Sequence, residues 1–400
     1  AFARYEVGYL LSLGVPVDWM DCIRSITADQ FVELSSQLPE EAAERLMRLL
    51  EGEAVAPPER AVDPYTNPDT TRRFLAVSNA QTLKAALDAP WERWVIFLHP
   101  TQRRIVETEF SGPAKVFGGA GTGKTVVGLH RAAWLARKNT NARILLTTFT
   151  KTLTSRINHQ LDLLMGAGDP ARKRIEVKHV HSIASRLFKQ GGNRLKLVST
   201  DQLRQLIERA RQAHEVDFCS TDYLLAEWTA IIDPMRIRSW ADYRSAPRKG
   251  RGRALGGRQK RRIWKAFEEV LECLERDGLQ TWEGVFYAVV ARLDAEPSLR
   301  YDHVIVDEAQ DFGLSGLRLL RALAKTGAGD LFLCADAGQR IYKGRFSLAG
   351  AGIDVRGRSR RLRVNYRTTE QIRGFSDRIV PTRLATDDGC LLYTSDAADE

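Results

Sequence analysis

A glycine-rich loop between a strand pattern and a helix pattern constrains the fold of this chain more than any other feature. Its residues fit the pattern G-x-x-x-x-G-K-T: Gly118, Gly119, Ala120, Gly121, Thr122, Gly123, Lys124 and Thr125. An apolar run over 114–117 precedes the loop and a helical pattern over 124–138 follows it, which is the setting of a phosphate loop. Glycines let backbone N–H groups turn toward phosphate oxygens, and a helix N-terminus favours negative charge. The sequence therefore predicts a nucleoside-triphosphate site in which Lys124 reaches the β and γ phosphates and Thr125 binds Mg²⁺.

Short apolar runs alternate with helical patterns along the middle of the chain. Besides 114–117, they cover 144–149, 303–307 and 330–336. This alternation is typical of an α/β fold with a parallel sheet flanked by helices. About 150 residues separate the second run from the third, which is too long for an ordinary connection. We therefore expect an inserted subdomain there, and its sequence pattern is helical.

Two adjacent carboxylates follow the third apolar run. Asp307 and Glu308 stand in the segment V-D-E-A-Q-D. A carboxylate at a strand tip can bind Mg²⁺ through a water molecule, and a second one beside it can polarise the water that attacks a phosphoryl group. We predict that Asp307 serves Mg²⁺ and that Glu308 is the general base.

The chain is basic, with a formal charge of +10 and a pI near 9.4. This balance favours an anionic partner, for which nucleic acid is the leading candidate. A stretch over 248–265 has no acidic residue and includes Arg251 and Arg253, which we predict to contact DNA phosphates. The alternative for this stretch is a solvated flexible loop.

The cysteines and the apolar runs limit the cellular setting. The five cysteines form no CxxC pair, which argues against a disulfide framework or a zinc site and favours a reducing, cytoplasmic compartment. No apolar run reaches the roughly 18 to 20 residues of a membrane helix, so we expect no membrane partner.

Taken in order, these motifs resemble those of superfamily 1 DNA helicases of the UvrD/Rep type, over about residues 90 to 380. The acidic segment reads as the family's motif II with glutamine fourth. The segment LHPTQ resembles the Q motif, which implies that Gln102 recognises the adenine edge and selects ATP. The segment VNYRTT resembles motif IV, which implies that Arg367 neutralises charge on the γ-phosphate as an arginine finger.

Two further segments resemble DNA-contacting motifs of the family. TTFTK looks like motif Ia, which implies that Phe149 stacks on a base and Lys151 contacts a phosphate. VHS looks like the TxHS-type element, which implies a DNA contact by His181. For Phe149 and His181, the alternative is a structural role in the core.

The segment DAGQRIY resembles motif III, which links nucleotide to DNA in the family. By this resemblance, Gln339 senses the γ-phosphate and Tyr342 lies near a base. Ala335 stands where the family commonly has glycine, a small departure in the local turn.

We predict a division of the chain into seven parts. These are a helical accessory module (1–55), a linker (56–73), the first part of a RecA-like motor domain (74–187), a helical basic insertion (188–298), the second part of that motor domain (299–350), the beginning of a second RecA-like domain (351–389) and a tail (390–400). The tail CLLYTSDAADE resembles a translated sequencing adapter, so we expect it to be non-native and the chain to be cut at both ends.

The resemblance implies an ATP- and Mg²⁺-dependent motor that moves along single-stranded DNA, 3′ to 5′, and unwinds single-strand/double-strand junctions in repair or replication-type processes. Two alternatives share its motifs: the motor half of a helicase–nuclease, and a nucleic-acid-dependent ATPase that does not unwind. A third, an unrelated phosphate-loop enzyme such as a kinase, is disfavoured by the motif II glutamine and the NYRT segment. Later family motifs do not precede Glu400, so we expect this chain alone to bind ATP weakly and to hydrolyse it inefficiently.

Overall fold

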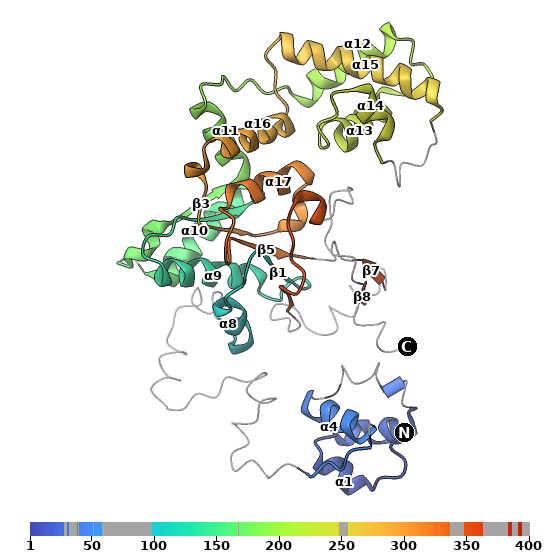
Figure 1. Ribbon diagram of the computed structural model, residues 1–400, viewed down its shortest axis with the longest axis vertical. Helices are drawn as coiled ribbons and strands as arrows, with labels where there is room; N and C mark the ends of the chain where they lie inside the picture. Colours follow the sequence, from blue (N-terminus) through green and yellow to red (C-terminus); the bar gives the residue numbers. More distant parts are fainter. Residues whose placement is uncertain are drawn as a thin grey trace.

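The structure, a computed structural model, describes residues 1–27, 30–31, 38, 40–50, 52–57, 98–166, 168–247, 255–336, 348–362, 383–385 and 391–393. These residues form a small N-terminal helical module, a domain built on a sheet, and an all-helical lobe (Figure 1). Within them, no helix combines the length and the apolar character needed to cross a membrane.

The N-terminal module is helical, as the apolar spacing of its sequence predicts. Its elements are α1 (Val7–Ser12), the short turn η1 (Val17–Trp19), α2 (Met20–Ser25) and α4 (Glu40–Leu50). Phe2 packs edge-on against Phe31 in its core, with ring centroids 5.0 Å apart. Thr27 and Gln30 form a reciprocal cap, because each backbone N–H donates to the other's side-chain oxygen, at 3.1 and 3.4 Å.

A six-stranded parallel sheet forms the centre of the larger domain. In spatial order its strands are β3 (Ile175–His179), β2 (Ile144–Thr148), β4 (His303–Val306), β5 (Leu331–Ala335), β1 (Ala114–Phe117) and β6 (Ser359–Arg361). Every residue of β2 and β5 is buried, as expected for a parallel sheet covered on both faces. Because all strands run the same way, their carboxyl ends meet at one edge of the sheet.

Helices lie on both faces of this sheet (Figure 1), and a hydrophobic core fills the space on each face. On one face lie α11 (Val180–Gln190), α16 (Trp282–Ala295) and α17 (Leu314–Leu323). On the other lie α8 (Pro100–Glu107), α9 (Lys124–Lys138) and α10 (Lys151–Met165). Alternation along the strands assigns Leu145 and Leu333 to the first core and Leu146 and Phe332 to the second. This layered arrangement confirms the predicted α/β fold.

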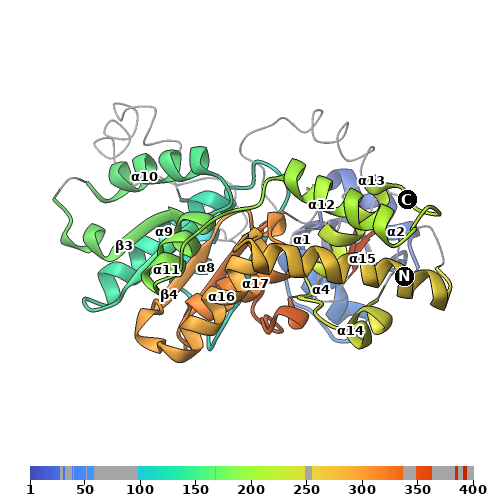
Figure 2. The ribbon, with the colours of Figure 1, turned by 90° about the horizontal axis from the view of Figure 1, so that it is seen from above.

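The helical lobe lies between α11 and α16 in the sequence. Its elements are α12 (Thr200–Ala213), α13 (Thr221–Glu227), the π-helical turn η4 (Trp228–Ile232), α14 (Trp240–Ser245) and α15 (Gly257–Arg276). Trp228, Tyr243 and Phe267 are at most 1% exposed and lie at the centre of a core that belongs to the lobe. Figure 2 shows α12 to α15 gathered on the side away from β3 and β4.

Two structural observations bear on the predicted domain boundaries. The second RecA-like domain was expected to begin at residue 351, whereas β6 pairs with β1 and Leu362 packs into the core beside α9. The insertion was expected to run to residue 298, but Phe286 and Leu293 of α16 pack on the sheet. Strands β3 and β6 were not predicted. Helical periodicity identifies a buried face without identifying what covers it, and β6, with three residues, carries little signal.

The remaining described elements are short. They are η3 (Pro170–Arg174), η5 (Pro297–Leu299), η6 (Ala309–Asp311), η7 (Ala349–Ala351) and the antiparallel strands β7 (Arg383–Ala385) and β8 (Leu391–Tyr393).

Candidate functional site

The loop between β1 and α9 has a backbone that favours glycine at two points. Gly121 and Gly123 have φ angles of +79° and +83°, a region in which other residues are strained. A Cβ atom on Gly123 would lie 2.7 Å from Nε2 of Gln102. Gly123 is also the N-cap of α9. The loop thus turns tightly onto a helix N-terminus, where backbone N–H groups attract anions.

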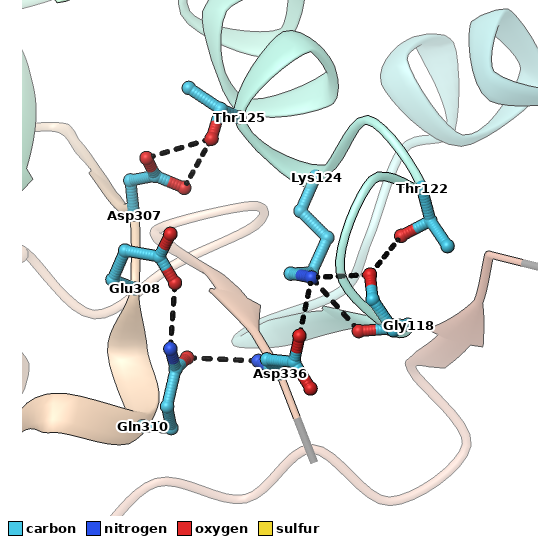
Figure 3. A network of polar contacts seen from close by, with 9 residues as sticks. Gly118, Thr122, Lys124, Thr125, Asp307, Glu308, Gln310 and Asp336 are labelled. Carbon is cyan, nitrogen blue, oxygen red and sulfur yellow. Dashed lines mark hydrogen bonds and ion pairs between the residues drawn. The ribbon is translucent and has the colours of Figure 1, made fainter. Parts of the chain in front are cut away.

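The ammonium of Lys124 makes three contacts at the start of α9 (Figure 3). Its Nζ donates to the carbonyl oxygens of Gly118 and Gly119, at 2.9 and 2.8 Å, and to Oδ2 of Asp336, at 3.1 Å. Lys124 is 8% exposed and Asp336 is 3% exposed. Because unpaired buried charges are costly, each of these two side chains depends on the other. Phosphate oxygens bound in the loop would compete for the same ammonium.

Thr125 and Asp307 bring the loop and motif II together. Oγ1 of Thr125 donates to the Asp307 carboxylate, 3.0 Å from Oδ2 and 3.2 Å from Oδ1. Asp307 directly follows β4 and is 3% exposed. Burial raises the pKa of Asp307 to about 7, and the nearby Glu308 carboxylate adds to this rise, while the Thr125 hydroxyl opposes it.

This pair fits a magnesium ion. A hydroxyl and a carboxylate are the hard oxygen ligands that Mg²⁺ takes, and the buried carboxylate of Asp307 would be stabilised as an anion by a nearby cation. The described residues contain no group of three or more His, Cys, Asp or Glu side chains able to hold a metal. The remaining ligands would therefore be phosphate oxygens and water, as is usual for Mg²⁺ bound with a nucleotide.

Glu308 lies beside this cluster in a constrained conformation. Its backbone is left-handed, with φ +53° and ψ +46°. Its Oε2 accepts a hydrogen bond of 2.6 Å from Nε2 of Gln310. Oε1 of Gln310 accepts from the backbone N–H of Asp336, at 2.8 Å. The structure thus brings together the phosphate loop, motif II and the residue that follows β5. Gln310 and Asp336 were not among the predicted site residues, although an acid directly after a buried strand was a signal for Asp336.

The side chain of Gln102 is hydrogen-bonded to the phosphate loop. Its Oε1 accepts from the backbone N–H of His99 and its Nε2 donates to the carbonyl oxygen of Thr122, each at 3.0 Å. The first contact is part of a capping box at the start of α8, and Gln102 is 3% exposed. The structure therefore gives Gln102 a role in holding the loop, and its contact with adenine stays a prediction.

Phe149 and His181 lie in a cluster of aromatic rings. Ring centroids of Phe149 lie 5.6 Å from His181 and 5.5 Å from Phe312, and His181 lies 4.6 Å from Trp282. Burial and, to a smaller extent, the nearby His179 together lower the pKa of His181 to about 4, so its ring is neutral at pH 7. Trp282, which is half-buried, was missed because it lies in the segment expected to be the insertion. The DNA contacts predicted for Phe149 and His181 are compatible with this cluster but stay predictions.

The remaining residues predicted to contact DNA or the γ-phosphate lie partly within and partly outside the described residues. Lys151 is exposed at the start of α10, where a phosphate can reach it. Gln339, Tyr342, Arg367, Arg251 and Arg253 lie outside the described residues. Within the basic stretch, Arg261 lies over the Trp240 ring at 4.9 Å and Arg262 pairs with Glu215 at 3.0 Å. Those two cations of α15 therefore already have protein partners.

Comparison with known proteins agrees with this geometry. Residues 98–351 match the model of the UvrD/REP helicase N-terminal domain. The chain belongs to this family. It is 27% identical to a DNA helicase II of Haemophilus influenzae over 311 residues, which cover 71% of this chain and 40% of that protein. It is 26% identical to the ATP-dependent DNA helicase UvrD1 of Mycobacterium leprae over 294 residues, which cover 67% of this chain and 37% of that protein.

Membership of the UvrD/REP family confirms the resemblance found in the sequence, and it identifies the parallel sheet with its flanking helices as a RecA-like motor fold. The chain spans about two fifths of the length of the curated relatives it matches, from 37% to 40%.

Proposed function

We propose that this UvrD/REP-family chain is the ATP-binding motor part of a DNA helicase or translocase. The motor couples ATP hydrolysis to movement along single-stranded DNA, 3′ to 5′, and unwinds junctions of single- and double-stranded DNA in repair or replication-type processes. Family membership and the names of the relatives support the activity. The direction and the processes are supported by the family resemblance.

One observation carries the proposal furthest. The cluster of Lys124, Thr125 and Asp307 and the aromatic cluster of Phe149 and His181 all follow the carboxyl ends of strands in one parallel sheet. A nucleotide and a single strand bound at this edge would contact neighbouring loops. Small shifts at one site can therefore reach the other through the loops that follow β2 and β4.

Each residue has a defined part in hydrolysis. Lys124 neutralises charge on the β and γ phosphates, and Gln102 holds the loop and reads the adenine. Glu308 polarises the attacking water and accepts its proton as the bond from the γ-phosphorus to the leaving oxygen of ADP breaks. Mg²⁺, held by Thr125 and Asp307, supplies further charge stabilisation when bound. Gln339 and Arg367 complete the γ-phosphate contacts.

DNA binding and domain division complete the proposal. Phe149 and Tyr342 stack on bases, His181 lines the same path, and Lys151, Arg251 and Arg253 contact phosphates. The module 1–55 is an accessory part joined by the linker 56–73, the helical lobe is an insertion beside the DNA, and the second RecA-like domain follows residue 362. Residues 390–400 are a non-native tail.

The test measures DNA-stimulated ATP hydrolysis by the protein that the longest open reading frame containing these residues encodes. We expect single-stranded DNA to raise the rate and Lys124→Ala to abolish it. Absence of stimulation by DNA would overturn the proposal, and a strand-displacement assay separates a helicase from an ATPase that does not unwind. For the 400-residue chain itself, we expect weak ATP binding and slow turnover, which efficient DNA-stimulated hydrolysis would contradict.

A further inference from the structure

The side chain of Gln310 joins the loop after β4 to the end of β5 (Figure 3). Its Nε2 donates to Oε2 of Glu308, at 2.6 Å, and its Oε1 accepts from the backbone N–H of Asp336, at 2.8 Å. Asp336 in turn accepts from Nζ of Lys124, at 3.1 Å. An unbroken series of polar contacts therefore runs from Glu308 to the phosphate loop, and the functions proposed above assign no part of it to Gln310.

Glu308 needs such a contact because its own side chain does not set its direction. A glutamate side chain loses substantial rotamer freedom when it is ordered. Glu308 is half-buried and follows the buried Asp307 in a left-handed backbone conformation. The described hydrogen bond to the Glu308 carboxylate from another side chain is the one from Gln310.

We propose that Gln310 is a positioning residue, which orients the Glu308 carboxylate and ties that orientation to Asp336 and Lys124. This inference rests on the proposed function, because it assumes that Glu308 is the base. The primary amide of Gln310 can donate to a carboxylate and accept from a backbone N–H at the same time without carrying charge. A glutamate at this position donates only when protonated, and an apolar side chain does neither.

The link also makes the base responsive to the nucleotide. Phosphate oxygens in the loop attract the ammonium of Lys124, which weakens its contact with Asp336. Because the backbone N–H of Asp336 holds the Gln310 amide, a shift of Asp336 moves the amide and with it the Glu308 carboxylate. The base therefore takes its working orientation when the loop is occupied.

Gln310→Ala tests this role through the separation of kcat from KM. In the protein encoded by the longest open reading frame, we expect kcat of DNA-stimulated hydrolysis to fall by about 10- to 100-fold. Misplacement of a catalytic group by about 1 Å lowers the rate by on the order of 10²-fold. KM for ATP should change much less than kcat, because Gln310 reaches the phosphate loop only indirectly, through Asp336 and Lys124. The matched control is Gln202→Ala, which removes an amide from an exposed capping box with Ser199 in the helical lobe.

Gln310→Glu gives an independent readout. Two carboxylates this close cannot both ionise, so the acidic limb of the pH–rate profile should move to higher pH. A residue with only a structural role would lower activity without moving this limb. If Gln310→Ala does not fold, the near-isosteric Gln310→Glu decides the question. Wild-type kcat with an unmoved acidic limb would overturn the inference.

Hydrogen exchange in the 400-residue chain separates this inference from the proposed function. Gln310→Ala should speed exchange of the Asp336 amide, while amides of β2 keep their protection. Unchanged exchange at Asp336 overturns the link. If the protein encoded by the longest open reading frame shows no DNA-stimulated hydrolysis, the proposed function fails, and exchange at Asp336 in the 400-residue chain still decides whether Gln310 forms the link.

Discussion

Nζ of Lys124 lies 3.1 Å from Oδ2 of Asp336, and both side chains are at least nine-tenths buried. The contact joins the phosphate loop to the end of β5 across 212 positions of sequence. Removing one partner of a buried ion pair leaves the other charge without compensation, which costs more than the pair contributes. A substitution at Lys124 therefore has two separable effects, on nucleotide binding and on the stability of the fold.

Lys124→Ala should destabilise the nucleotide-free protein by about 3 kcal/mol, because the buried Asp336 carboxylate loses its ion pair with Lys124. The double variant Lys124→Ala/Asp336→Asn should recover most of this stability and none of the nucleotide affinity. Urea unfolding measures the first effect and binding of a fluorescent ATP analogue the second. A wild-type unfolding midpoint in Lys124→Ala would show that the pair does not stabilise the fold.

Asp307→Asn should stabilise the protein at pH 8 in the absence of Mg²⁺. The pKa of Asp307 is about 7 in the fold and 3.8 in a model peptide, so the folded state binds this proton more tightly. Its contribution is most favourable below pH 3.8, falls as the pH rises toward 7, and is lost above 7. At 1.36 kcal/mol per pKa unit, the free energy of unfolding of Asp307→Asn should exceed that of the wild type by about 4 kcal/mol at pH 8.

Urea unfolding at pH 5 and pH 8 checks this expectation, and the difference between Asp307→Asn and wild type should narrow at pH 5. Asp354 is the control, because its contacts with Arg356 hold its pKa low. Asp354→Asn should therefore give no gain at pH 8. If Asp307→Asn raises the free energy of unfolding equally at both pH values, the raised pKa of Asp307 is contradicted.

Acid should destabilise the aromatic cluster because the buried ring of His181 becomes protonated. Burial lowers the pKa of His181 to about 4 from 6.5, so the folded state disfavours the charged ring. The stability it contributes is complete above pH 6.5 and is lost as the pH falls toward 4. His181→Phe should make the melting temperature less sensitive to pH in this window, and an equal sensitivity in both proteins would refute the idea.

Gly123→Ala should destabilise the phosphate loop. Its φ of +83° costs an alanine about 1–3 kcal/mol, and the added Cβ would displace the Gln102 amide. Gly119 is a matched comparison for stability, because a Cβ there meets nothing within 4 Å. We expect the melting temperature to be lowered in Gly123→Ala and unchanged in Gly119→Ala. Equal melting of the two variants would show that the tight turn does not matter.

Trp282 lies 4.6 Å from His181, in the aromatic cluster for which we propose DNA contacts, so Trp282→Ala should weaken binding of single-stranded DNA by about 10- to 100-fold, since stacking of one base contributes about 1–3 kcal/mol. Trp282→Phe should retain most of the affinity because it keeps an aromatic face beside His181. Fluorescence anisotropy with a labelled oligothymidine measures both. Trp240→Ala, in the helical lobe, controls for the loss of an indole, and equal loss in both alanine variants would argue against a stacking role at Trp282.

The phosphate loop, motif II and the α/β class could be read directly from the sequence. Each is encoded by local chemistry: glycines that permit positive φ angles, apolar runs that end in carboxylates, and helices that begin directly after a loop. The predicted helix over 124–138 matches α9 residue for residue, and the apolar run 114–117 matches β1. Those patterns need no knowledge of what the segment packs against.

Only the tertiary structure decided which distant residues meet. The contacts of Asp336 with Lys124 and with Gln310 depend on strand order, which places β5 between β4 and β1. The same holds for α16, whose helical pattern was clear but whose place on the sheet was not, and for Trp282 beside His181. Periodicity records that a face is buried, whereas the identity of its partner is set by contacts between segments more than a hundred residues apart.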